Sequence, residues 1–292
     1  MSVKTCVVLL AVAVAPLSAQ PDEGLNFSAR IVGSANEAGT VMRIDPIAGY
    51  VFNRYFSVEG GVPLYIVRPS ESVRQTTGAG PVNGIGNVFG TLRLTLAAED
   101  GPQLLSALTV SAPTGDVGRG LGTGRTVVDW TNFVSGNVGR LRPFGSLGFA
   151  NAVSDTAFFV RPFFTHGAIT HLEGGADYLV GDRWAVGGSA YRIIPRGDQT
   201  VVSRVHPATL RVPPNGPPFI RARPFLDSQQ QTGDAALVRD HGLSAWWQLW
   251  PTRGTSLQLG FSRSMEYRMN TFFFGVGIHF GSLIKRTRHG IS

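Results

Sequence analysis

The sequence predicts an all-β protein, a single 12-stranded antiparallel up-and-down transmembrane β-barrel. Segments of about ten residues alternate apolar and polar side chains, as in a strand with lipid on one face and a polar lumen on the other. Residues 271–280, TFFFGVGIHF, show this most clearly. The chain also has 37 glycines and only 15% charged residues, which suits turns and close strand packing in lipid. Because unpaired backbone groups are costly in hydrocarbon, such a sheet must close on itself.

Residues 1–20 predict a secretory signal peptide. Lys4 supplies the positive charge, residues 7–15 form a short apolar core, and Ala19 stands at the expected cleavage site. Cys6 is the single cysteine and lies in this segment, so the mature chain is expected to lack disulfides and cysteine-based metal sites. After it, no run approaches eighteen apolar residues, which excludes helical membrane spans. We expect the barrel over residues 21–280 and a periplasmic tail over 281–292.

Period-2 alternation predicts each strand. In LSAWWQLW, for example, Leu243 and Trp247 share one face, and Ser244 and Gln248 share the other. The expected strands cover residues 25–33, 41–52, 55–67, 84–97, 103–113, 125–138, 143–153, 166–180, 183–195, 241–250, 255–266 and 270–280.

The connections between these strands sort into two classes. Short, turn-forming sequences rich in Gly, Asp and Asn stand at 53–54, 98–102, 139–142, 181–182 and 251–254. The alternate connections, at 34–40, 68–83, 114–124, 154–165 and 196–240, are longer, apart from a tight one near 267–269. Short periplasmic turns and longer external loops are typical of outer-membrane barrels.

Aromatic residues gather near the short turns, at Tyr50, Phe52, Phe56, Trp184, Trp247 and Trp250. They are expected to form a girdle at the membrane–water interface, and the alternative is packing in a core. The loop 196–240 is dense in proline and mildly basic, and proline at this density cannot join a strand ladder. It is expected to be an external loop touching anionic lipopolysaccharide, with a constriction inside the barrel mouth as the alternative.

The polar faces of the strands supply candidate lumen residues of both signs. Pairing across strands would make them structural, and a free arrangement would let them select ions. The pore-lining candidates are Arg43, Asp45, Glu59, Arg93, Asp129, His171, Glu173, Asp177, Glu266 and Arg268, and Arg30 shares their face.

The chain carries no motif that predicts an enzyme, a cofactor or a metal site. His171, Glu173 and Asp177 share one strand face, but a metal would need a further ligand from a neighbouring strand. Residues 120–125, GLGTGR, precede a strand and have no following Lys-Ser/Thr, so they do not match a phosphate-binding loop. The net charge of +7 comes partly from the terminal segments, and no basic stripe interleaved with aromatics indicates nucleic-acid binding.

Short motifs over residues 41–280 resemble a family of outer-membrane β-barrels. The glycine-rich GIGNVFGTLRL (84–94), the SAPTGD turn (111–116), GLGTGR and the pair Asp129-Trp130 are similar to motifs of the meta-pathway phenol degradation family, often described as transporters. The resemblance implies a membrane channel for small, often aromatic solutes, with no catalytic residues. This chain departs from the pattern because twelve residues follow Phe280, whereas such barrels usually end at that aromatic.

These observations predict an outer-membrane channel or facilitator for passive passage of small solutes, aromatic or hydrophobic ones among them. The alternative is a structural or adhesion-type barrel with a plugged lumen. Its expected partners are outer-membrane lipid, lipopolysaccharide, the barrel-insertion machinery and the solute.

Overall fold

The computed structural model of the protein describes residues 23–97, 101–153, 155–156, 159–205, 230–233, 238–252 and 254–280. The expected signal peptide and the expected tail after Phe280 lie outside these residues. None of the helices in the described part of the chain is long and apolar enough to cross a membrane.

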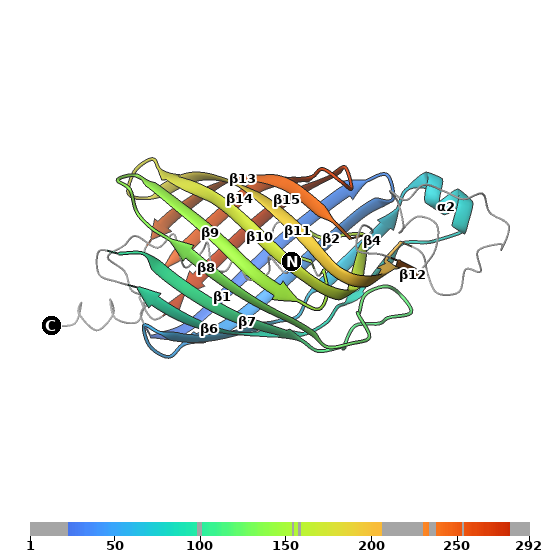
Figure 1. Ribbon diagram of the computed structural model, residues 1–292, viewed down its shortest axis with the longest axis horizontal. Helices are drawn as coiled ribbons and strands as arrows, with labels where there is room; N and C mark the ends of the chain where they lie inside the picture. The colour runs from blue at the N-terminus through green and yellow to red at the C-terminus, as the bar shows by residue number, and fades with distance from the viewer. Residues whose placement is uncertain are drawn as a thin grey trace.

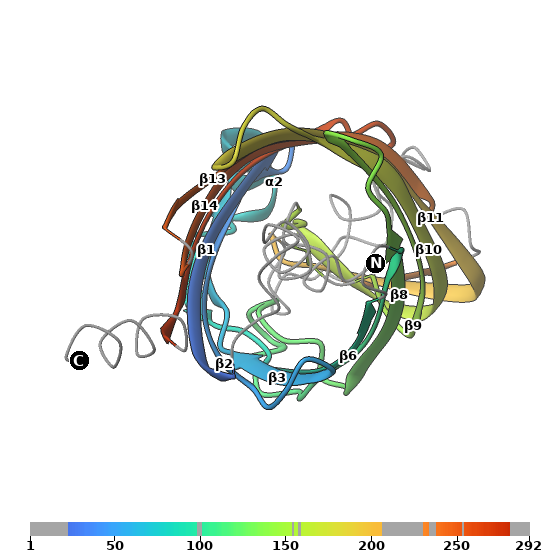
Figure 2. The ribbon, with the colours of Figure 1, turned by 90° about the vertical axis from the view of Figure 1, so that its left-hand side faces the viewer.

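The strands close into one antiparallel ring, seen end-on in Figure 2. Each strand pairs with its neighbours along the chain, and β1 pairs with both β2 and β15, which completes the closure. The wall consists of β1 (Gly24–Asn36), β2 (Gly39–Val51), β3 (Phe56–Gly61) with β4 (Leu64–Pro69), β5 (Val82–Ile85) with β6 (Phe89–Ala97), β7 (Gln103–Ser111), β8 (Val127–Ser135), β9 (Leu141–Ala150), β10 (Phe163–Leu179), β11 (Trp184–Ser203), β13 (Asp240–Thr252), β14 (Thr255–Ser264) and β15 (Met269–His279). The twelve-stranded prediction is confirmed, since β3 and β4, and likewise β5 and β6, share one position in the wall.

Two of the predicted strands are interrupted. The strand expected at 55–67 breaks between β3 and β4 at Val62-Pro63, where Pro63 has no N–H to give to the ladder. The strand expected at 84–97 breaks between β5 and β6, at residues 86–88, which bond instead to the loop after β7. The two breaks lie side by side, because the Gly86 N–H donates to the Pro63 carbonyl at 2.7 Å.

The connections are segregated as expected, with two differences. The segment 34–40 is no loop, because β1 and β2 extend to a two-residue turn at Glu37-Ala38. The long loop also starts later than predicted, since β11 continues to Ser203 and pairs with a short β12 (Gln230–Gly233). The segment 70–81 holds a helix, α2 (Glu71–Thr77), capped by the Ser70 hydroxyl. Both α2 and β12 lie at the right-hand end of the barrel in Figure 1.

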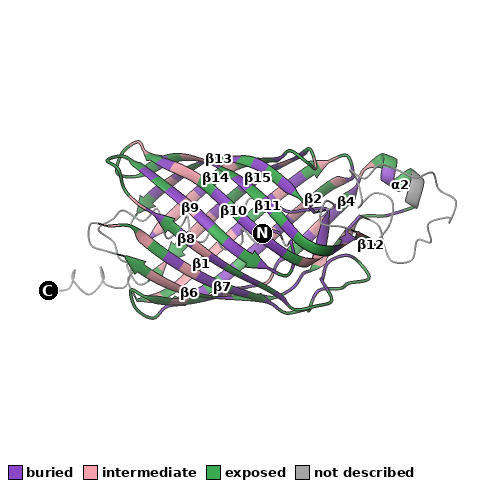
Figure 3. Ribbon diagram, viewed as in Figure 1, coloured by how far each residue is buried: buried purple, intermediate pink, exposed green. Residues whose placement is uncertain are grey.

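Burial alternates along the strands, as the banding in Figure 3 shows. Large apolar side chains point outward, for example Leu92, Leu259 and Phe272, with 52%, 52% and 65% of their surface exposed. Charged and amide side chains on the opposite face are buried. A soluble protein would reverse this arrangement, so the exterior is built for lipid and the barrel spans a membrane.

Most of the expected girdle aromatics lie on the exterior near the short turns. The rings of Tyr50 and Phe52 are exposed and meet edge-to-face, with their centroids 5.1 Å apart. Trp184 and Trp247 are exposed as well. Trp250 is the exception, because it is buried on the lumen side. The prediction that Trp250 belongs to the girdle was therefore wrong. Residues three apart on a strand face opposite sides, so Trp250 faces the lumen when Trp247 faces the exterior.

Candidate functional site: a loop folded into the lumen

Eight of the ten pore-lining candidates lie on the inward face of the wall. The structure buries all eight and gives them partners on the strands of the wall. They are Arg43 and Asp45 on β2, Glu59 on β3, Arg93 on β6, Asp129 on β8, and His171, Glu173 and Asp177 on β10. The polar face of the sheet therefore points into the barrel as predicted.

The remaining two candidates are not on that face. Glu266 and Arg268 lie in the exposed turn 265–268 between β14 and β15. Glu266 Oε1 lies 3.5 Å from Nδ1 of the exposed His241. Arg268 has a positive φ of 45°, which is typical of a turn and not of a strand. The predicted strand at 255–266 ran two residues too far, and so placed Glu266 on the wall.

Opposite charges pair within the wall. Arg93 and Glu59 form an ion pair between β6 and β3. Arg142 meets Asp177 at 2.9 Å, and the Trp246 indole N–H donates to the same carboxylate at 2.8 Å. Such contacts between strands of the wall favour the structural interpretation of these particular charges.

Two further candidates on β10 also find partners in the wall. His171 Nε2 lies 3.3 Å from Asp129, and the Ser189 hydroxyl donates to Glu173 at 2.6 Å. A side chain on Gly148 would collide with the His171 ring, because its Cβ would lie 2.0 Å from His171 Cε1. The small residue therefore lets the imidazole lie flat against the wall. Among the described residues, no three His, Cys, Asp or Glu side chains gather where they could hold a metal ion.

The most consequential feature is the connection between β9 and β10, residues 151–162. The prediction placed residues 154–165 in an external loop, but Asp155, Thr156, Phe159, Val160 and Arg161 are all buried. The loop reaches β1 and β2, which stand opposite β9 and β10 in the ring. Arg43 on β2 donates to the Thr156 carbonyl at 2.7 Å, and the Val160 N–H donates to the Ser34 hydroxyl on β1 at 3.3 Å. The loop therefore bridges the lumen from wall to wall.

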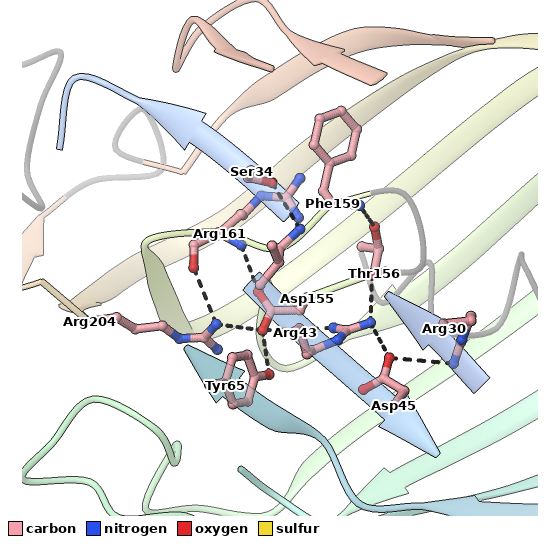
Figure 4. Close-up of polar contacts among 11 residues, drawn as sticks. Arg30, Ser34, Arg43, Asp45, Tyr65, Asp155, Thr156, Phe159, Arg161 and Arg204 are labelled. Carbon is pink, nitrogen blue, oxygen red and sulfur yellow. Dashed lines mark hydrogen bonds and ion pairs between the residues drawn. The ribbon is translucent and has the colours of Figure 1, made fainter. Parts of the chain in front are cut away.

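Asp155 is the centre of this bridge, as Figure 4 shows. Its carboxylate accepts from the Tyr65 hydroxyl on β4 at 2.5 Å and from Arg204 Nη1, just after β11, at 2.6 Å. The Arg161 N–H donates to its other oxygen at 2.9 Å, and Arg43 Nη1 stands 3.8 Å away. Donors from three separate wall elements thus converge on one loop side chain.

A second anchor holds the other side of the loop. The Arg161 guanidinium lies 3.4 Å from Asp240 at the start of β13, and the Tyr191 hydroxyl donates to the same carboxylate at 2.9 Å. The Phe159 ring packs edge-to-face on Tyr191 at 5.1 Å. The Phe159 side chain therefore meets the wall instead of water.

Positive charge is in slight excess around the loop. Arg30, Arg43, Arg161 and Arg204 are set against Asp45, Asp155 and Asp240. Burial lowers the pKa of the Arg204 guanidinium, but the attraction of Asp155 outweighs it, and the pKa lies above its ordinary value. The guanidinium also lies over the Tyr65 ring at 4.4 Å.

The PTGD and glycine-rich motifs meet beside this cluster. The Gly115 N–H donates to Asn87, whose amide donates to Thr123 at 2.5 Å. Gly122 lies so close that a Cβ there would be 2.0 Å from the Gly115 carbonyl oxygen. These segments close the wall beside the break between β5 and β6, so their glycines serve backbone contact and not phosphate binding.

Comparisons with known proteins give no family for the chain. No family model matches it, and no curated protein matches it. The resemblance to the phenol degradation family thus remains one of short motifs.

Several solved barrels are similar in outline. The NanC porin is 6% identical, covers 86% of this chain and 98% of its own, and has a TM-score of 0.49. The translocator domain of autotransporter NalP from Neisseria meningitidis is 11% identical over 94% and 95%, with a TM-score of 0.47. The CymD monoaromatic hydrocarbon channel is 8% identical over 89% and 88%, with a TM-score of 0.40. All three scores fall below 0.5.

Proposed function

We propose that this protein is an outer-membrane channel for passive passage of small solutes, narrowed by the loop 151–162. The observation that carries the proposal is the loop's position, because its buried polar contacts cross a lumen lined by charged and amide side chains. Eight-stranded barrels are filled by side chains, and barrels of sixteen strands hold aqueous channels. A twelve-stranded barrel lies between these sizes, where a single inward loop decides how much passage remains.

The outer membrane is the proposed location. Single-chain antiparallel barrels with short turns at one end and longer loops at the other occur there. The apolar exterior would contact lipid, the external loops would meet lipopolysaccharide, and the insertion machinery would read the last strand up to Phe280. The short-motif resemblance extends the proposal to aromatic solutes.

A structural barrel with a closed lumen is the second candidate. The pairing of Glu59 with Arg93 and of Asp177 with Arg142 favours it, because paired charges are consistent with a filled interior. The two candidates differ in one measurable property, which is ion flow through the lumen of the barrel.

Single-channel recording in planar bilayers tests the proposal. We expect the folded wild-type protein to give resolved current steps, and replacement of residues 154–160 by a Gly-Ser linker of equal length to enlarge each step several-fold. Glu71→Ala, on the exposed helix α2, is the matched control and should leave the step unchanged. Silence from both the wild type and the linker variant, with each shown to be folded, would establish the structural barrel instead.

A further inference from the structure

The side chains that hold Asp155 are arranged as a carboxylate-binding site. Tyr65 and Arg204 donate to the Asp155 carboxylate at 2.5 and 2.6 Å, and Arg43 adds positive charge 3.8 Å away. A hydroxyl donor and two guanidinium groups, all buried, are what an enclosed carboxylate needs to offset the loss of water. All three belong to the wall or its continuation, whereas the carboxylate belongs to the loop.

Arg204 depends on this carboxylate. Among the residues that the structure describes, Asp155 is the carboxylate that meets Arg204, and the other recorded contacts of its guanidinium are the Arg161 carbonyl and the rings of Tyr65 and Phe164. Arg43, in contrast, keeps Asp45 at 2.6 Å. If the loop withdrew, Arg204 would remain as a buried cation beside a free phenol hydroxyl, which is costly unless another anion replaces Asp155.

Space next to this carboxylate indicates the shape of the replacing anion. A small pocket lies beside Asp155 and Arg204, lined by Tyr65, Phe164, Leu121 and Val127 and also by the polar side chains of Asn87, Ser111 and Thr123. Its walls are therefore partly apolar and partly polar, and the rings of Tyr65 and Phe164 lie next to the Arg204 guanidinium. A small solute with a carboxylate and a compact, partly apolar body would match this lining.

We infer that Tyr65, Arg43 and Arg204 form a binding site for small monocarboxylates with a compact, partly apolar body, and that Asp155 occupies it as a built-in substitute for the solute. A solute carboxylate that takes these donors displaces Asp155 and releases the loop from the wall. The inference rests on the proposed channel function and names the class of solute that the channel would pass.

Benzoate binding to the purified full-length barrel in detergent, measured by calorimetry, tests the site. Asp155→Ala vacates the donors, so we expect it to bind benzoate at least tenfold more tightly than the wild type. Asp155→Asn, which keeps the shape of the side chain and removes its charge, should show a smaller gain. Benzyl alcohol, which has the same ring and no charge, should bind neither variant measurably.

A second substitution shows whether the gain belongs to this site. Arg204→Gln in the Asp155→Ala background should abolish it, whereas Glu71→Ala in the same background should preserve it. Equal benzoate affinities of folded wild type, Asp155→Ala and Asp155→Asn would overturn the inference, and so would equal binding of benzyl alcohol. Heat-modifiable migration on gels reports folding of each variant, so loss of structure is not mistaken for loss of the site.

The binding result and the conductance result are separable. A barrel that conducts ions but whose Asp155→Ala form does not bind benzoate would refute the carboxylate site alone. A barrel whose Asp155→Ala form binds benzoate but never conducts would refute the channel alone.

Discussion

Tyr65→Phe removes one oxygen from the contacts that hold the loop 151–162 in the lumen. The Tyr65 hydroxyl donates to Asp155 at 2.5 Å, and the bonds to Asp155 from Arg204 and from the Arg161 N–H remain in the variant. Phenylalanine retains the ring that lies under Arg204. The substitution therefore weakens the attachment of the loop without opening a cavity or changing the charge of the lumen.

The size of the effect follows from the charge of the acceptor. A hydrogen bond to a charged group contributes about 1.5–3 kcal/mol. Since about 1.4 kcal/mol changes an equilibrium constant tenfold, the population with a released loop should rise roughly 10- to 100-fold.

Thiol labelling measures that population. Val160 is fully buried and its N–H donates to Ser34, so a Val160→Cys thiol reacts with a maleimide when the loop leaves the wall. Cys6, the only natural cysteine, is replaced by serine in every variant. When reclosing is faster than labelling, the labelling rate follows the open population. Tyr65→Phe should therefore raise the rate roughly 10- to 100-fold.

Tyr178→Phe is the matched control, because Tyr178 lies on the exterior of β10 and is 46% exposed. It should label at the parent rate. If folded Tyr65→Phe also labels within about twofold of its parent, the Tyr65–Asp155 bond does not hold the loop and the reasoning from charge is refuted.

Other substitutions test the wall. Glu59→Gln or Arg93→Gln alone should destabilise the barrel by about 3–5 kcal/mol in denaturant titrations, because each leaves a buried charge without its partner, and the double variant should cost less than the sum. Leu259→Arg, on the lipid face of β14, should cost about 2–4 kcal/mol in folding into liposomes, whereas Gln258→Arg, on the buried lumen face next to it, should cost less. An equal cost for the two would contradict the assignment of faces. Gly122→Ala should lower the unfolding midpoint, since its Cβ would collide with the facing backbone at 2.0 Å; an unchanged midpoint would mean that these loops separate freely.

The wall of the barrel could be predicted because its pattern is local. Alternation along a strand states directly which side chain meets lipid, so Leu243 and Trp247 were separated correctly from Ser244 and Gln248. The same alternation places Trp250 in the lumen, and proximity to a turn does not distinguish the two faces of a strand. The errors at Glu266 and at 34–40 have one origin, since strand ends depend on partner strands that the sequence does not display.

The loop in the lumen could not be predicted from alternation, but its composition carried a signal. Residues 157–164, AFFVRPFF, contain four phenylalanines, which an external loop in water has little reason to hold. Asp155, Arg161 and Arg204 gave no such signal, because their partners on β2, β4 and β13 are far away in the sequence. The loop 196–240, expected to be external with a constriction in the barrel mouth as the alternative, lies largely outside the described residues.

The contacts of the loop 151–162 bear on the order in which the barrel is assembled. Val160 and Ser34 are 126 residues apart in the chain, and Arg161 and Asp240 are 79 apart, so the loop joins β1, at the start of the barrel, to β13, the third strand from its end. Contacts this distant repay their chain entropy late in folding. Ring closure through β1 and β15 and the filling of the interior are then coupled events. We expect the lumen of a partly assembled barrel to stay hydrated until the last strands have joined the sheet.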